Sequence, residues 1–139
     1  MPELPEVETV AQSVKKHLIN NRFISLRVNW EKTLHNFTVA DFNRKIKDRL
    51  IKDVYRRGKY ILIDLNKSLL AVHLRMTGKL YAANSIDKSK KHISLYLKLD
   101  GKYLVFEDTR KFGRFYMFDN MDYLNERLGI EPLLGDFSK

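Results

Sequence analysis

Five short runs rich in β-branched and aromatic residues constrain the fold of this chain more than any other feature. The runs are KYILIDL, LLAVHLRM, ISLYLKL, KYLVFE and RFYMF. Turn-forming residues separate them at Asn66-Lys67-Ser68, at Asp100-Gly101 and between Thr109 and Gly113. Runs of this length and composition predict strands, and an Asp-Gly pair between two alternating runs predicts a two-residue hairpin. This part of the chain is therefore expected to be mainly antiparallel β-sheet.

Two segments with helical periodicity precede these runs. Apolar residues recur behind Pro5 at Val7, Val10, Ala11, Val14 and Leu18, which predicts an amphipathic helix near residues 5–19. The segment TVADFNRKIKDRL places Phe42, Ile46 and Leu50 four apart behind a possible cap at Thr38, and it predicts a second helix. Between them, RFISLRVNW alternates like a strand. The expected fold class is α+β, a mainly antiparallel β-sandwich flanked by an N-terminal helix and a second helix.

The length of 139 residues favours one domain with a modest core. We predict a β-sandwich domain over residues 1–128. Residues 129–139 are expected to be the start of a linker, because MDYLNERLGIEPLLGDFSK resembles a short helix that ends at Gly129 and continues as an extended, proline-containing tail.

Composition excludes several classes of site. The chain has no cysteine, and its four histidines show no paired metal-ligand spacing, so we expect no metal site and no cofactor within it. The N-terminus is acidic and lacks an apolar core, and no apolar run approaches the length of a membrane span. We therefore expect a cytoplasmic protein that does not bind membranes, and we further expect it to act as a monomer.

The charge of the chain indicates a polyanionic partner. Lysines and arginines number 26 against 17 acidic residues, which gives a formal net charge of +9. The excess is concentrated in NRKIKDRLIKDVYRRGKY and DKSKKH. Nucleic acid is favoured over a membrane surface because no basic amphipathic segment carries exposed Trp or Phe anchors.

The opening MPELPEVETV has two interpretations. Helix-start rules account for Pro5 and for the carboxylates of the first turn, because these complement the helix dipole. Alternatively, Pro2 becomes a free secondary amine once Met1 is removed, and such an amine condenses with a sugar carbon to an iminium ion that favours loss of neighbouring phosphates. Glu3 could then carry protons, and Glu6 is either a second, orienting carboxylate or a plain dipole-compensating residue.

Two basic motifs also allow both a structural and a functional interpretation. RRGKY is either a solvated turn or a phosphate clamp in which Gly58 lets the backbone come close and Lys59 supplies charge. HLRMTG ends a strand with His73 and Met76, which by themselves are most often a structural hydrogen-bonding group and a core residue.

A third motif, EDTRKFG, places Phe112 between cations on a tight corner, where an exposed aromatic ring suits insertion into a base stack. Taken in order, MPELPEVETV, RRGKY, HLRMTG, DTRKFG and the closing LGIEPL resemble the bacterial formamidopyrimidine-DNA glycosylase family, also called the Fpg/Nei family. The resemblance spans nearly the whole chain in the order of that family's N-terminal domain. It implies a β-sandwich that excises oxidised bases and cleaves the strand by β,δ-elimination.

The resemblance implies a catalytic group of four residues. Pro2 would be the nucleophile at the sugar C1′, and Glu3 would be the proton donor and acceptor. Glu6 would support Glu3. Lys59 is counted with the catalytic residues and would hold a phosphate beside the lesion.

The resemblance also implies four residues that bind DNA. His73 would hold a second flanking phosphate. Met76, Arg110 and Phe112 would fill the void left by the extruded nucleotide and wedge the base stack. His92, in a family-like Lys-His pair, receives no role.

Leu4 and this set of wedge residues are similar to the oxidised-purine branch, so the implied partner is double-stranded DNA that carries 8-oxoguanine, a formamidopyrimidine or an abasic site. Members of the family continue into a helix-two-turn-helix module and usually a four-cysteine zinc finger, which this chain lacks. We therefore expect zinc in a longer parent and little or no activity in this chain alone. The alternative is a noncatalytic basic domain that binds nucleic acid.

Overall fold

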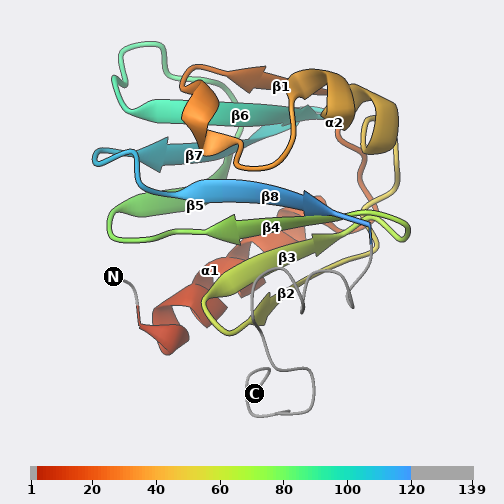
Figure 1. Ribbon diagram of the computed structural model, residues 1–139, viewed down its shortest axis with the longest axis horizontal. Helices are drawn as coiled ribbons and strands as arrows, with labels where there is room; N and C mark the ends of the chain where they lie inside the picture. The colour runs from red at the N-terminus through yellow and green to blue at the C-terminus, as the bar shows by residue number, and fades with distance from the viewer. Residues whose placement is uncertain (1–2, 120–139) are drawn as a thin grey trace.

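The computed structural model describes residues 3–119, and within them two four-stranded antiparallel sheets form a β-sandwich (Figure 1). The first sheet has the order β1 (Ser25–Val28), β6 (Ile93–Leu99), β7 (Lys102–Asp108), β5 (Gly78–Ala83). The second has the order β2 (Asp53–Arg57), β3 (Tyr60–Asp64), β4 (Leu69–His73), β8 (Arg114–Phe118). The predicted α+β sandwich is thus confirmed, as is the hairpin at Asp100-Gly101, where Gly101 has φ 78°.

The first helix, α1 (Leu4–Leu18), lies along one open side of the sandwich. It packs against β2 and β5, which are edge strands of the two different sheets. Four of the five predicted apolar residues, Val7, Ala11, Val14 and Leu18, are buried, and the fifth, Val10, is partly buried against the core. The predicted N-terminal helix is therefore confirmed, and its packing joins the two sheets.

The second helix, α2 (Val39–Lys45), begins where the sequence predicted and ends earlier. The Thr38 hydroxyl accepts a hydrogen bond from the Asp41 N–H at 3.1 Å, and the Asp41 carboxylate accepts one from the Thr38 N–H at 2.9 Å. Phe42 and Ile46 are buried, but Leu50 is 44% exposed, so the prediction that Leu50 continues the apolar face is wrong. The backbone turns away before it, because Asp48 is left-handed with φ 66°. A short 3₁₀ helix, η1 (Glu31–Thr33), precedes α2.

The sequence did not predict two of the strands, β2 and β5. Both are edge strands, and each buries few side chains: Val54 and Arg56 in β2, and Leu80 in β5. An edge strand with a half-polar sequence carries a weak apolar pattern, and neither interpretation of RRGKY, as a solvated turn or as a phosphate clamp, placed Arg56 and Arg57 in a strand, where they end β2.

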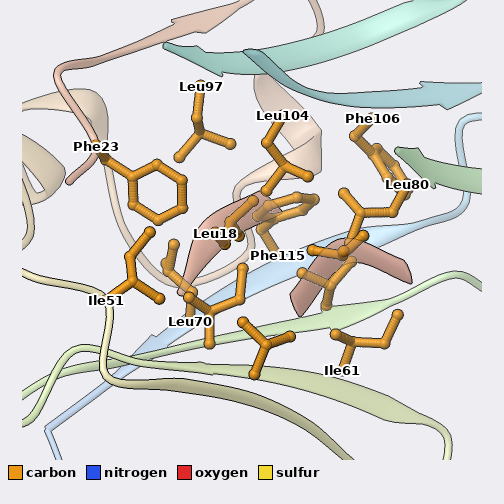
Figure 2. Close-up of a cluster of buried hydrophobic side chains, with 14 of the residues drawn as sticks. Leu18, Phe23, Ile51, Ile61, Leu70, Leu80, Leu97, Leu104, Phe106 and Phe115 are labelled. Carbon is orange, nitrogen blue, oxygen red and sulfur yellow. The ribbon is translucent and has the colours of Figure 1, made fainter. Parts of the chain in front are cut away.

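The core lies between the two sheets. Figure 2 shows side chains of the first sheet, such as Leu97, Leu104 and Phe106, facing Leu70 and Phe115 of the second. The second sheet is also apolar on its other face, where a smaller cluster contains Leu62, Leu69, Ala71, Tyr116 and Phe118. The central strands of the second sheet are thus buried on both faces.

The predicted start of the linker at residue 129, and the helix and tail predicted around it, lie outside the described residues. Within residues 3–119, no helix is long and apolar enough to cross a membrane.

Candidate nucleic-acid interface

One end of the sandwich collects the start of α1 and three connections, β2–β3, β4–β5 and β7–β8, at the left of Figure 1. The pairing of the strands explains why these connections lie at the same end. Tyr60, which follows the β2–β3 turn, pairs with His73 at the end of β4, and His73 pairs with Arg114 at the start of β8. In the other sheet, Gly78 pairs with Asp108. The motifs RRGKY, HLRMTG and EDTRKFG therefore meet at one end of the fold.

The start of α1 presents two exposed carboxylates at this end. The backbone N–H of Glu3 donates to the Glu6 Oε1 atom at 2.8 Å. Glu6 thereby holds the backbone of the residue to which Pro2 is bonded, which is compatible with its supporting assignment. Pro2 itself lies outside the described residues.

Arg56 connects α1 to the β2–β3 turn. It is 4% exposed, its Nε donates to the Glu8 Oε1 atom at 3.1 Å, and its Nη1 donates to the Gly58 carbonyl at 3.0 Å. The hydrogen bond from Gln12 and the charge and hydrogen bond of Arg56 hold the pKa of Glu8 below its ordinary value. Gly58 has φ 60°, a conformation that favours glycine. Arg56 therefore faces the protein and fixes the turn that carries Lys59, a role that the sequence did not reveal.

His73 lies buried at the end of β4, where burial favours its neutral form. It is 8% exposed, and the edge of one ring meets the face of the other between His73 and Tyr60, with centroids 4.9 Å apart. Burial lowers the pKa of His73 to about 4, and the nearby Arg75 and Lys59 charges add to this effect. Its Nδ1 atom accepts from the Arg75 N–H at 3.0 Å, which leaves the proton on Nε2. His73 can therefore donate a hydrogen bond to a phosphate but brings no charge at neutral pH.

The predicted wedge residues lie on two connections at this end. Met76 follows β4 and is 51% exposed, while Phe112 lies in the β7–β8 loop and is 45% exposed. Arg110 is exposed on the same loop, with its guanidinium carbon 5.1 Å from the centre of the Phe112 ring. The structure thus excludes the interpretation of Met76 as a core residue, and it shows Phe112 exposed as the sequence predicted.

Further residues at this end were missed or left without a role. The carbonyl of the exposed His92 accepts from the Asp108 N–H at 2.8 Å, so His92 borders the β7–β8 loop. Lys111 places its ammonium 5.9 Å from the Trp30 ring centre. In the sequence, the Lys-His pair at 91–92 was the pattern that could have indicated His92. No such pattern indicated the contact of Lys111 with Trp30, because these residues are far apart in the sequence. No group of three or more metal-ligating side chains occurs among the residues from Glu3 to Asp119.

A β-sandwich with basic side chains, a buried histidine and exposed apolar side chains gathered at one end is typical of domains that bind nucleic acid. The sequence profile of the formamidopyrimidine-DNA glycosylase N-terminal domain matches residues 1–115. The chain therefore belongs to the formamidopyrimidine-DNA glycosylase family.

Curated relatives and solved structures agree with this assignment. The chain is 43% identical over 143 residues to formamidopyrimidine-DNA glycosylase of Herpetosiphon aurantiacus, covering 99% of this chain and 52% of the relative. It is 40% identical over 141 residues to that of Protochlamydia amoebophila, covering 99% and 51%. The structure of Lactococcus lactis Fpg with DNA containing an abasic site has a TM-score of 0.84 at 29% identity, covering 92% of this chain and 48% of that one. The chain spans about half the length of the curated relatives it matches.

Proposed function

We propose that this domain carries the base-excision chemistry of a DNA glycosylase with abasic-site lyase activity, acting on oxidised purines such as 8-oxoguanine and formamidopyrimidines. The observation that carries the proposal is the convergence of Glu3, Lys59, His73 and the wedge residues at one end of the sandwich. The family assignment supports it, as does the fold shared with an Fpg bound to abasic-site DNA.

In the proposed reaction, the Pro2 nitrogen attacks C1′ of the damaged nucleotide and the bond from C1′ to the base breaks. Glu3 carries protons between the reacting groups, so the base leaves with a proton and the sugar ring opens to an iminium ion. The iminium accepts the electron pair released when a C2′ proton is removed, and the 3′ phosphate leaves; a second elimination expels the 5′ phosphate. An unprotonated amine is needed, and terminal amines have pKa values of about 7.7 to 8.0.

Lys59 and His73 would hold the phosphates beside the lesion, while Met76, Arg110 and Phe112 fill the space that the extruded nucleotide leaves. We further propose that the domain acts as a monomer on one duplex. Any zinc required would belong to a part of the protein outside residues 1–139, because this chain has no cysteine thiolate.

Borohydride trapping tests the proposal. Reduction converts an iminium between the N-terminal amine and an abasic sugar into a stable adduct, which we expect to map to Pro2 in a preparation from which Met1 has been removed. Binding of abasic-site DNA without an adduct would favour the alternative, a noncatalytic nucleic-acid-binding domain. An adduct at a lysine side chain would contradict the assignment of Pro2.

The two phosphate-binding residues are expected to differ in their salt dependence. Lys59→Ala removes a charge, so the slope of log affinity against log salt should become less negative by about 0.9 on B-DNA. His73→Ala should weaken binding with little change in slope, because burial keeps His73 neutral at pH 7. Fluorescence anisotropy with a duplex at a series of salt concentrations measures both. Equal changes in slope would show that His73 binds DNA as a cation.

Phe112→Ala should weaken binding to abasic-site DNA about tenfold to hundredfold, the range of a lost aromatic stacking contact. Because Phe112 is half exposed, its removal should leave the melting temperature nearly unchanged. Leu50→Ala is the matched control, since Leu50 is an equally exposed apolar residue near α2, away from the candidate interface. A large loss of stability in Phe112→Ala alone, with no loss of affinity, would assign Phe112 to packing.

A further inference from the structure

The wedge residues stand on two separate connections, and one buried carboxylate lies between them. Asp108, the last residue of β7, is fully buried and pairs with Gly78 at the start of β5. Its position therefore borders both the turn that carries Met76 and the loop that carries Arg110 and Phe112.

Each oxygen of this carboxylate accepts hydrogen bonds from those connections. Oδ1 accepts from the Thr77 hydroxyl at 2.5 Å and from the Arg110 N–H at 3.1 Å, and Oδ2 accepts from the Gly113 N–H at 2.8 Å. No salt bridge within residues 3–119 involves Asp108. A buried charge requires compensation, and here these three donors supply it.

Thr77 links the two connections directly. Its hydroxyl donates to Asp108 and also accepts from the Arg110 N–H at 3.2 Å. Both segments contain a left-handed residue other than glycine, Arg75 with φ 58° and Lys111 with φ 59°. Such conformations persist only where surrounding contacts hold them, and the bonds to Asp108 are contacts of this kind.

The two segments also rest on one aromatic ring. A Cβ atom at either Gly78 or Gly113 would overlap the Phe106 side chain, so both backbones approach this ring closely. Phe106 is fully buried and packs edge to face against Phe115, with ring centroids 5.3 Å apart. Packing on the Phe106 ring and hydrogen bonds to Asp108 thus both hold the two segments in place.

We propose that Asp108 is a positioning residue that, through Thr77, joins the Met76 turn and the Arg110–Phe112 loop into one preorganised insertion unit. The proposal rests on the proposed function. Preorganisation matters because a wedge that is already ordered loses little conformational freedom when it enters the base stack. Asp108 contacts no DNA in this scheme and acts only through the residues it holds.

Hydrogen exchange in the DNA-free chain tests the linkage independently of catalysis. In Asp108→Asn, an NH₂ group replaces one of the two acceptor oxygens and faces another hydrogen-bond donor. At least one of the backbone amides of Arg110 and Gly113 should therefore exchange hydrogen at least tenfold faster than in the native chain. Amides in the middle of β4, such as that of Ala71, should keep their rates. Asp100→Asn is the control, because it removes the same charge at the opposite end and retains a good turn sequence. Unchanged exchange at both Arg110 and Gly113 would overturn the proposal.

Thr77 provides a second, milder pair of variants in case Asp108→Asn does not fold. Thr77→Val removes the hydroxyl with little change of shape and should speed exchange at Arg110, whereas Thr77→Ser should retain the native rate. Similar rates in the two variants would contradict the linkage through Thr77.

A double-mutant cycle then tests the positioning role. Asp108→Asn should lower affinity for abasic-site duplex at least fivefold in the native background and less than twofold in Phe112→Ala, while affinity for undamaged duplex stays within twofold in both. Equal losses in the two backgrounds would show that Asp108 does not act through Phe112. If the native chain shows no preference for abasic sites, the proposed function fails, and hydrogen exchange still decides whether Asp108 joins the two segments.

Discussion

Pro2→Gly is expected to reduce excision of 8-oxoguanine at least a hundredfold in a longer protein that contains this domain. Glycine leaves a primary amine, whose imine must gain a proton to become an electron sink, whereas the secondary amine of proline forms a charged iminium directly. Glycine also frees the backbone beside Glu3, and a small misplacement of a nucleophile can cost about a hundredfold in rate. Single-turnover excision on an 8-oxoguanine duplex measures the effect.

Glu3→Gln is the informative control for this substitution. It keeps the secondary amine and removes the proton carrier, so it should impair excision more than cleavage of a preformed abasic site. Retention of Met1 provides a further check, because an amide nitrogen at Pro2 has no basic lone pair; mass spectrometry establishes which terminus a preparation has. Undiminished excision in Pro2→Gly, or full lyase activity with Met1 retained, would remove Pro2 from the mechanism.

Residues 1–139 alone are expected to excise 8-oxoguanine at least a hundredfold more slowly than a full-length relative. In the proposed scheme only Lys59 and His73 hold phosphates, and each missing cationic contact removes about 0.9 from the logarithmic salt slope. Less binding energy then remains to offset extrusion of the nucleotide, which costs a few kcal/mol. Weak trapping on a preformed abasic site should survive, because an open-ring aldehyde requires no recognition of the base.

The comparison uses full-length formamidopyrimidine-DNA glycosylase of Herpetosiphon aurantiacus, of which this chain matches about half. Single-turnover rates are measured at low salt on one 8-oxoguanine duplex. The matched half of that relative, prepared by itself, is the control and should lose activity to a similar extent. Comparable rates for residues 1–139 and the full-length relative would show that this domain is sufficient for excision.

Local patterns in the sequence predicted several elements at nearly their observed bounds. The runs ISLYLKL and RFYMF coincide with β6 and β8, because strands that bury most of their side chains need nearly continuous apolar and aromatic residues. Thr38 was predicted as a cap because its hydroxyl can serve the first turn of α2. The sequence missed β2 and β5 because they bury few side chains and so carry a weak apolar pattern. The left-handed Asp48 ended the apolar face before Leu50, which its spacing had placed on the helix.

The candidate site also contains residues that the sequence singled out and contacts that only the structure shows. Residue type and motif order singled out Lys59, His73, Met76, Arg110 and Phe112, and the exposure of the apolar members agrees with a wedge. Their roles as DNA contacts stay predictions. The sequence did not indicate that Arg56 turns inward to Glu8 or that Asp108 bonds both wedge segments, since these contacts join residues 48 and 31 positions apart in the chain.

By itself, therefore, the sequence determined the α+β class, the family and the set of candidate residues, because periodicity, turn chemistry and motif order are recorded locally along the chain. Only the tertiary structure decided that burial favours the neutral form of His73, that Arg56 turns inward to Glu8 and that Asp108 accepts hydrogen bonds from both connections. Each of these properties depends on desolvation or on hydrogen bonds between segments distant in the sequence. Such effects exist only after the two sheets have packed together and excluded water.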